Sequence, residues 1–331
     1  MKFNQKTRLA LAAIGLFAAQ MASAQTSLLN VSYDVSREFY KDLNAAFVAQ
    51  YKKSTGKDIK VDQSHAGSSA QARAVADGLE ADVVTMNTTT DVEFLASKGV
   101  VAADWAKRFP HSAAPTTSTM LFLVRNGNPK GIKDWDDLTK PGIQVVVVNP
   151  KTGGNGRMAY LAAWGSVRAK GGTDAQAAEF VGKLYKNVPV LARGGRDATG
   201  IFLQRNIGDV LVTFESEVVS VDKEFGAGKV DAIHPSASIV AENPVAIVER
   251  TVAKKGTATE AKAYLDFLYS DEGQEIAAKH NIRPRNEAIL KKYSNALRPI
   301  KLFTVNEYFG SLAEAQKVHF NDGGQFDKLY T

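Results

Sequence analysis

The sequence of 331 residues contains no cysteine. This absence excludes disulfide bonds, thiol catalysis, cysteine-based zinc sites and a lipid-modified N-terminal cysteine. Repeats and low-complexity tracts are also absent, and a composition of 44% apolar and 23% charged residues is that of a soluble globular protein. The length exceeds what one hydrophobic core usually serves, so we expect two domains.

No apolar run is long enough to span a bilayer, which takes roughly 20 residues. The longest, Leu9 to Ala19, follows Lys2, Lys6 and Arg8 and precedes the small residues Ala22-Ser23-Ala24. This pattern predicts a cleaved secretory signal peptide over residues 1–24. Without it the formal net charge falls from +6 to +3, with Lys and Arg scattered, so we expect no nucleic-acid partner. An exported chain with no anchor is best placed in a bacterial periplasm.

Short apolar runs alternate with amphipathic segments along the mature chain. The runs predict strands at Leu28–Tyr33, Ile59–Asp62, Ala81–Met86, Met120–Arg125, Ile143–Asn149, Pro189–Ala192, Asp209–Phe214 and Pro244–Val248. The amphipathic segments predict helices at Arg37–Tyr51, Ser69–Leu79, Arg157–Arg168, Asp174–Lys186, Thr199–Asn206 and Glu260–His280. This alternation indicates an α/β class with parallel sheets.

Ligands of such sheets bind beyond the carboxyl ends of the strands, where the next helix begins. Four loops at such positions are rich in small and hydroxyl residues: Ser32–Ser36, Ser64–Ser69, Asn149–Gly156 and Ala192–Thr199. Free N–H groups at a helix N-terminus favour an anion, and glycine lets the anion approach the backbone. A single such turn is usually only a helix cap. Four of them indicate a buried oxyanion site.

Enzyme signatures are weak. Gly154 to Ala159 matches a relaxed dinucleotide-binding fingerprint, but Asp174, at the expected spacing, begins a helix where it should end a strand. Gly195 to Gly200 has phosphate-loop spacing without the required lysine. The five histidines lack metal-ligand spacing, so we expect no metal. Paired acids such as Asp136-Asp137 are more often capping or solvated than catalytic.

Several segments resemble the periplasmic sulfate- and thiosulfate-binding proteins of ABC importers. They include Leu28–Asp34, Gln63–Ser69, Gly127–Lys130, Asp134–Leu138, Asn149–Thr152, Tyr160–Gly165, Ile207–Leu211, Tyr269–Gln274, Arg283–Arg285 and Leu302–Thr304, which span the mature chain. The resemblance implies a type II periplasmic binding protein fold: two α/β lobes, each a sheet flanked by helices, with the ligand in the cleft between them. It places lobe I at residues 25–117 and 245–284 and lobe II at residues 118–244 and 285–331, with crossings near Thr117–Phe122, Asn243–Val248 and Ile282–Asn286.

The same resemblance implies the ligand-binding residues. The N–H of Asp34, the hydroxyl and N–H of Ser68, and the N–H groups of Gly154, Asn155 and Gly195 would hold the oxygens of the anion, with no direct lysine or arginine ligand. Two family side-chain donors are missing, because Gly153 and Phe214 stand at those positions; the Thr152 hydroxyl can replace the first. Phe214 and the loop at Ser68 look closer to the thiosulfate branch, and a ring without N–H suits a polarizable sulfur. The alternative interpretation is that Phe214 is an ordinary core residue at the end of a strand.

We therefore expect a monomeric solute-binding protein for sulfate or thiosulfate that needs no cofactor, catalyses no reaction and delivers its ligand to the membrane permease of an ABC importer. Two alternatives remain open. One is a binding protein for another oxyanion, molybdate or phosphate. The other, from a different class, is an exported oxidoreductase that uses its glycine loop for a nucleotide.

Overall fold

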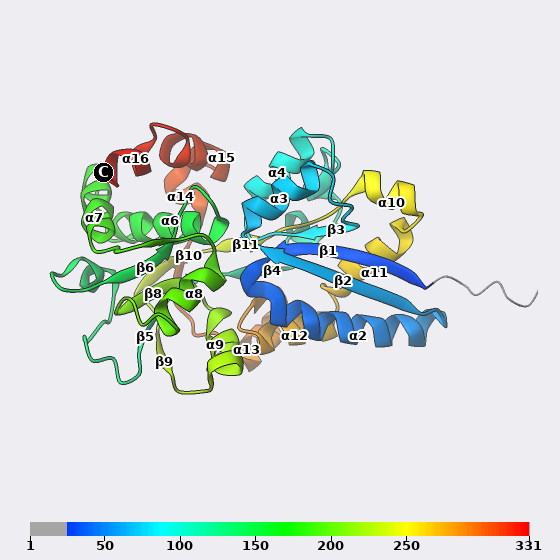
Figure 1. Cartoon of the computed structure of the whole chain (residues 1–331), viewed down its shortest axis with the longest axis horizontal. Coiled ribbons are helices and arrows are strands. Elements are labelled where there is room, and N and C mark those ends of the chain that lie inside the picture. Colours follow the sequence, from blue (N-terminus) through cyan, green and yellow to red (C-terminus); the bar gives the residue numbers. More distant parts are fainter. Residues whose placement is uncertain (1–24, 331) are drawn as a thin grey trace, which may run out of the picture.

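The structure, a computed structural model, describes residues 25–330. The signal peptide predicted for residues 1–24 lies outside them. Figure 1 shows two lobes side by side, with β4 and β11 between them. None of the helices in the described residues combines the length and the apolar character that a membrane crossing requires.

Lobe I contains a four-stranded sheet in the order β12-β3-β1-β2. The strands are β1 (Thr26–Tyr33), β2 (Ile59–Ala66), β3 (Val83–Thr85) and β12 (Val245–Ile247). The helices around it are η1 (Asp34–Ser36), α2 (Arg37–Thr55), α3 (Ser68–Ala76), α4 (Thr89–Ser97), η2 (Trp105–Lys107), α5 (Pro110–Ala113), α10 (Glu249–Lys255), α11 (Ala258–Phe267) and α12 (Asp271–Lys279), with α13 (Glu287–Lys292) against α12. The core includes Leu28, Val31 and Val83 of the sheet and Leu43 and Phe47 of α2.

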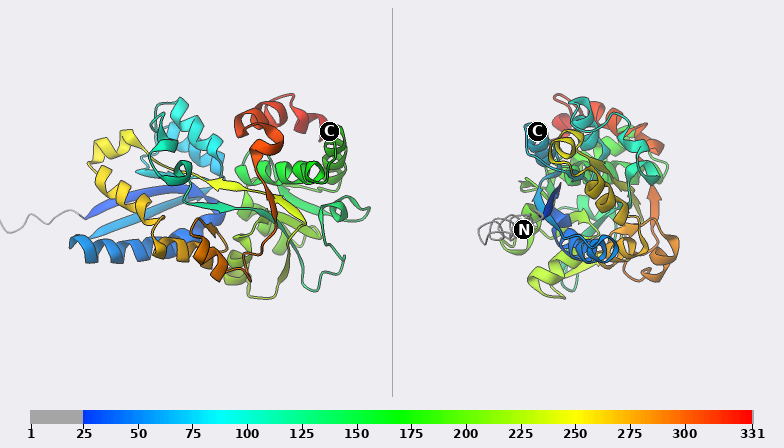
Figure 2. Two further views of the ribbon diagram at one scale, coloured as in Figure 1. Left: turned by 180° about the vertical axis from the view of Figure 1, so that it is seen from behind. Right: turned by 90° about the vertical axis from the view of Figure 1, so that its right-hand side faces the viewer.

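Lobe II contains a five-stranded sheet in the order β7-β6-β8-β5-β9. The strands are β5 (Met120–Arg125), β6 (Val145–Val148), β7 (Leu191–Ala192), β8 (Val210–Phe214) and β9 (Val230–Ile233), and a separate pair joins β10 (Ala237–Ile239) to β14 (Lys301–Phe303). The helices are η3 (Trp135–Thr139), α6 (Gly154–Ala169), α7 (Asp174–Lys186), α8 (Gly195–Leu203), α9 (Glu217–Phe225), α14 (Val305–Phe309), α15 (Leu312–Ala315), the π-helix η4 (Gln316–Phe320) and α16 (Gln325–Leu329). Its C-terminal helices lie against α6 and α7 (Figures 1 and 2).

The eight predicted strands are confirmed, but the prediction of wholly parallel sheets was wrong. β12 runs antiparallel to β3, and β5 runs antiparallel to both β8 and β9. Strands buried on both faces read as continuous apolar runs whichever way they point, so the hydrophobic pattern carries no direction. The helix predicted over Glu260–His280 is also two helices, because Ser270 caps a new start by accepting from the N–H of Gly273 at 3.1 Å.

A third sheet lies between the lobes. It contains β4 (Thr116–Ser118), paired antiparallel with both β11 (Ala241–Asn243) and β13 (Arg283–Pro284). Arg283 also makes a bidentate ion pair with Glu215, at the end of β8, with two N–O distances of 2.7 Å. This ion pair links the third sheet to the residue that follows β8 in lobe II. The lobe boundaries predicted from the sequence stay a prediction.

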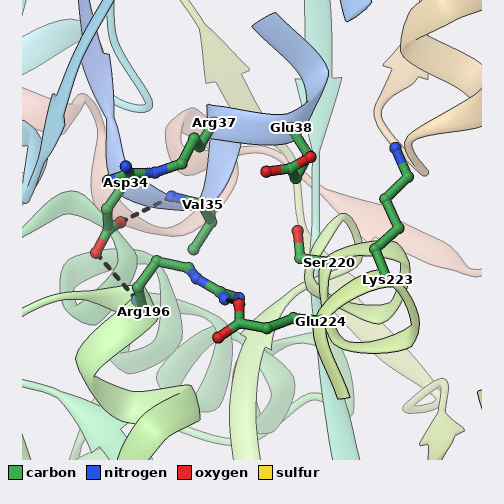
Figure 3. Close-up of a pocket in the computed structure, with 8 residues that line it drawn as sticks. All are labelled: Asp34, Val35, Arg37, Glu38, Arg196, Ser220, Lys223 and Glu224. Carbon is green, nitrogen blue, oxygen red and sulfur yellow. Dashed lines mark hydrogen bonds and ion pairs between the residues drawn. The ribbon is translucent and has the colours of Figure 1, made fainter. Parts of the chain in front are cut away.

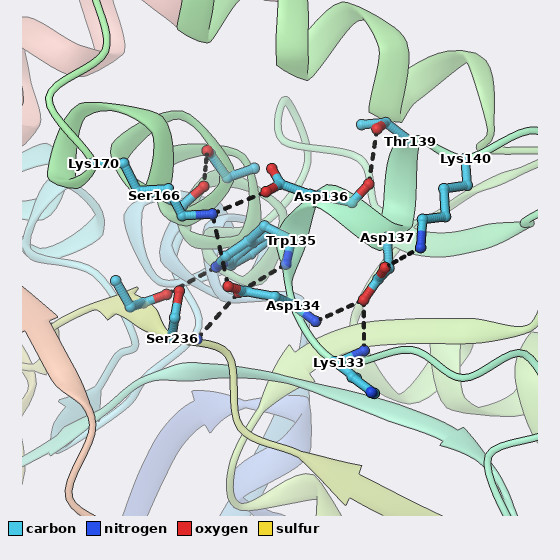
Figure 4. Close-up of polar contacts among 12 residues, drawn as sticks. Lys133, Asp134, Trp135, Asp136, Asp137, Thr139, Lys140, Ser166, Lys170 and Ser236 are labelled. Atoms are coloured by element: carbon cyan, nitrogen blue, oxygen red, sulfur yellow. Dashed lines mark hydrogen bonds and ion pairs between the residues drawn. The ribbon is translucent and has the colours of Figure 1, made fainter.

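The paired acids at Asp136-Asp137 have structural partners (Figure 4). Asp137 accepts from the N–H groups of Lys133 and Asp134 at 2.7 and 3.0 Å, and Asp136 pairs with Lys170 at 3.1 Å. Burial alone would raise the pKa of Asp137, but the Lys140 ammonium and these N–H donors lower it to about 2. The capping interpretation is confirmed, and the segment holds the buried Trp135, whose Nε1 donates to the carbonyl of Ala237 at 2.8 Å.

Candidate functional site

The four predicted loops each join a strand to a helix. In lobe I, β1 leads into η1 and β2 into α3; in lobe II, β6 leads into α6 and β7 into α8. The helix starts meet across the interface between the lobes. A Cβ atom added to Gly67 would lie 3.5 Å from the carbonyl oxygen of Arg193, and one added to Gly195 would lie 2.5 Å from Cγ1 of Val35. The glycines therefore let the backbones of the two lobes approach closely.

The helices α3, α6 and α8 begin at glycine N-caps, Gly67, Gly153 and Gly194. None of the three carries a side-chain cap, whereas α7, which is not at this interface, is closed by a capping box from Thr173. The first-turn N–H groups of an uncapped helix have no partner inside the helix and carry partial positive charge. Three such ends at one place form a binding surface for negative charge.

Asp34 lies at the start of η1 and joins the lobes through its carboxylate. Oδ1 accepts from the N–H of Val35 at 2.9 Å, and Oδ2 accepts from the N–H of Arg196 in α8 at 3.0 Å (Figure 3). Burial raises the pKa of Asp34, although the two N–H donors oppose the shift. The side chain thus occupies one first-turn donor of α8, and the N–H of the preceding Gly195 is the donor that the family resemblance assigned to the anion.

Ser68 is buried at the first position of α3. Its hydroxyl donates to Oδ2 of Asp91 and lies 3.8 Å from Sδ of Met86. Ser69 donates to the other oxygen of Asp91 at 2.8 Å. Asp91, in α4, therefore orients both serine side chains, and nothing in the sequence pattern pointed to it.

Arg157, in the first turn of α6, reaches from lobe II to this cluster. Its Nη2 donates to Ser69 at 2.9 Å and to Asp91 at 3.2 Å, and both charged side chains are buried. Removing one member of such a pair leaves an uncompensated buried charge and typically costs about 3–5 kcal/mol. The pair therefore holds the N-terminus of α6 against α4, and the bond to Ser69 adds α3. Arg157 was not predicted, because Ser69 and Asp91 lie 88 and 66 positions away in the sequence.

The remaining predicted residues lie at the same place. Thr152 donates to the carbonyl of Asn149 at 3.1 Å, within its own loop. Asn155 is buried, with Nδ2 donating to Thr213 at 3.2 Å and Oδ1 without a partner among the described residues. Phe214 ends β8, is 1% exposed, and packs edge-on against Tyr33 with ring centroids 6.4 Å apart. Its ring thus belongs to the core that borders the site.

A pocket of about 530 Å³ lies between the lobes, beside Asp34 (Figure 3). The residues that line it come from both lobes: Asp34, Val35, Arg37, Glu38, Arg196, Ser220, Lys223 and Glu224. Arg196 is neutralised there by Glu224, and its Nη1 also contacts Glu217. Burial raises the pKa of Glu217 to about 7, although Arg196 opposes the shift.

β2 extends beyond the predicted Ile59–Asp62, and His65 lies within it, with Nδ1 2.9 Å from the carbonyl oxygen of Tyr33 in β1. Within residues 25–330 no group of three or more His, Cys, Asp or Glu side chains could hold a metal ion. Asp174 begins α7, as predicted, and does not end a strand, so the structural context of a dinucleotide-binding fingerprint is not met.

Helix N-termini without side-chain caps meet from both lobes at one interface, which is an arrangement that binds a ligand between the lobes. The comparisons agree. The chain belongs to the bacterial extracellular solute-binding protein family, whose model matches residues 30–283. It is 53% identical to the thiosulfate-binding protein of Pseudomonas aeruginosa, with 97% of each chain covered, and 49% identical to the sulfate-binding protein of Escherichia coli, covering 95% and 96%. The resemblance found in the sequence is thereby confirmed.

The solved structures agree on the fold. The sulfate-binding protein SubI from Mycobacterium tuberculosis matches with a TM-score of 0.81 at 30% identity, covering 90% of this chain and all of that one. A periplasmic thiamin-binding protein and the molybdate-binding protein of Azotobacter vinelandii match at 15% identity with TM-scores of 0.59 and 0.54, which is a likeness of fold alone. The predicted two-lobed α/β architecture of type II binding proteins is confirmed.

Proposed function

We propose that this chain captures sulfate and thiosulfate in the periplasm and delivers them to the membrane subunits of an ABC importer. It performs no chemical step. The observation that carries the proposal is the meeting of three glycine-capped helix N-termini, those of α3, α6 and α8, from both lobes at one interface. The names of its relatives, thiosulfate- and sulfate-binding proteins, support the choice of anion.

The site suits a dianion that must later be released. Each helix N-terminus carries about half a positive charge, so several together stabilise two negative charges without a fixed counter-ion. The cations nearest the site are paired: Arg157 with Asp91, and Arg196 with Glu217 and Glu224. In this scheme the oxygens of the anion accept from backbone N–H groups and the Ser68 hydroxyl; the N–H groups are those of Asp34, Ser68, Gly154, Asn155 and Gly195.

Both anions are included because the relatives do not separate them. Identity falls from 53% for one thiosulfate-binding protein to 49% for a sulfate-binding protein and to 45% for a second thiosulfate-binding protein, from Escherichia coli. Overall similarity therefore does not rank the two ligands. Further parts of the proposal are export by the signal peptide, action as a monomer, and the lobe boundaries predicted from the sequence.

Isothermal titration calorimetry of refolded, anion-stripped protein with sulfate, thiosulfate, phosphate, molybdate and NAD tests the proposal. We expect binding of the two sulfur anions only. Hydrogen phosphate brings an O–H that needs an acceptor, and a site of donors leaves it unpaired at about 1–3 kcal/mol. Equal affinities for phosphate and sulfate between pH 6 and 8, tighter binding of molybdate, or binding of NAD would each overturn the proposal.

A further inference from the structure

The pocket beside Asp34 is lined by η1 and the first turn of α2 from lobe I, and by α8 and α9 from lobe II (Figure 3). Two polar contacts join the lobes there. One is the hydrogen bond from the N–H of Arg196 to Asp34. The other is an ion pair between Lys223 of α9 and Asp42, in the second turn of α2, with Nζ 3.3 Å from Oδ2. This ion pair links the lobes without using a residue assigned to the anion.

Asp42 is held in place by a buried histidine of its own lobe. Nε2 of His280, the residue that ends α12, lies 2.7 Å from the same Oδ2, and its ring packs edge-on against Phe39 with ring centroids 5.9 Å apart. His280 is 5% exposed, and burial lowers its pKa, although the bond to Asp42 opposes the shift. The neutral ring donates a hydrogen bond but does not neutralise the carboxylate, so the cation that pairs with Asp42 is Lys223 of the other lobe.

The fixed position of Asp42 favours this ion pair over most pairs of exposed side chains. Such pairs usually contribute little, because two mobile side chains must be immobilised in one geometry. Here His280 already holds the carboxylate, so only Lys223 loses freedom when the lobes meet. Partial burial alone would raise the pKa of Asp42, but the hydrogen bonds from His280 and Lys223 lower it, so the carboxylate is charged at neutral pH.

We propose that Asp42 and Lys223 form a latch that holds the lobes closed around the bound anion, with His280 as the positioning residue of the carboxylate. The proposal rests on the function proposed above. Opening of the cleft moves α9 away from α2 and breaks the ion pair, so the pair stabilises the closed form alone. The latch therefore slows release of an anion that neither residue contacts.

Stopped-flow fluorescence and calorimetric titration with sulfate and thiosulfate test the latch in Lys223→Ala and Asp42→Asn. Each variant should release both anions about 2- to 5-fold faster than the parent and bind them more weakly by the same factor, which is the range of an exposed ion pair. The double variant should lose no more than either single one, because the two residues act through one contact. Lys223→Arg, which keeps the charge, should retain most of the parent's affinity.

The direction of the Asp42→Asn effect separates a latch from simple electrostatic attraction. If Lys223 served only as a positive charge that attracts the anion, removal of the negative charge of Asp42 would strengthen binding. The latch requires the opposite, because either substitution breaks the same ion pair. The two explanations therefore predict affinity changes of opposite sign in this variant.

Lys52→Ala is the matched control, since it removes a lysine of α2 whose ion pair with Asp58, at 2.7 Å, is also exposed and lies within lobe I. It should leave the release rate and the affinity unchanged. If Asp42→Asn binds the anions as tightly as the parent or more tightly, or if the losses of the single variants add in the double variant, the latch is refuted and the proposed function stands. If the parent itself binds neither anion, the proposed function fails, and the latch with it.

Discussion

A substitution at Gly194 tests whether anion binding requires the N-terminus of α8 to approach Asp34 of the other lobe. Gly194 is the N-cap of α8, and its backbone is extended (φ −162°, ψ 174°), a conformation that alanine adopts without strain. A Cβ atom at this position would nevertheless lie 2.6 Å from Oδ2 of Asp34, which belongs to the other lobe. Gly194→Ala therefore leaves α8 able to form and prevents its N-terminus from reaching Asp34.

The expected loss follows from the contact that is broken. Oδ2 of Asp34 accepts from the N–H of Arg196 at 3.0 Å, and a hydrogen bond to a charged group contributes about 1.5–3 kcal/mol. Because this bond joins the lobes, it is lost only from the closed form, and affinity for sulfate and thiosulfate should fall about 10- to 150-fold. The melting temperature of the anion-free protein should change little.

Gly200→Ala is the control, since Gly200 lies in the same helix and a Cβ there would meet only Oε1 of Gln204, at 3.5 Å. It should raise the melting temperature, because alanine is favoured over glycine by about 1 kcal/mol inside a helix, and leave affinity unchanged. Calorimetry gives the affinities, and small-angle X-ray scattering gives the compaction on adding anion. If Gly194→Ala binds and compacts as the parent does, closeness at Gly194 does not limit closure and the reasoning is refuted.

Three further outcomes are expected. Ser68→Ala should keep its fold and lose about 1.5–3 kcal/mol of anion affinity, an outcome that requires the hydroxyl to turn from Asp91 to the anion when the anion binds; if Ser69→Ala loses affinity in its place, the assignment within this loop is shifted by one residue. Phe214→Trp adds an N–H that oxygen accepts better than sulfur, so the ratio of sulfate to thiosulfate affinity should rise by about 1 kcal/mol, and an unchanged ratio would make the ring core packing only. Glu217 keeps its proton in the folded state up to about pH 7, against an ordinary value of 4.5, so the free energy of unfolding should fall as pH rises between these values. Glu217→Gln should flatten that dependence in thermal unfolding, and an unaltered slope would contradict it.

The positions of the site loops could be predicted from the sequence because they depend on local order. A strand followed by a glycine-rich turn and a helix places the turn at the carboxyl end of the strand, and this held for the loops at Asp34, Ser68, Gly154 and Gly195. The type of each element follows from periodicity in the same way. These are properties of neighbouring residues.

The side chains that orient the predicted site residues could not be predicted, because their contacts join residues far apart in the sequence. Asp91 meets Ser68 across 23 positions and Arg157 across 66, and no spacing rule links them. The antiparallel pairing of β12 with β3 was not predicted for a similar reason, since the strands of lobe II lie between β3 and β12 in the sequence.

That late arrival of β12 has a consequence for how the protein is made. β3, with the sequence Val83-Val84-Thr85, is completed on one edge by β12, and the whole of the lobe II sheet lies between them in the chain. A chain that emerges from its N-terminus therefore exposes an unpaired apolar strand edge until most of its length is available, and such edges pair readily with other chains. Synthesis of the second lobe and pairing of β12 with β3 therefore have to outpace aggregation of the first lobe.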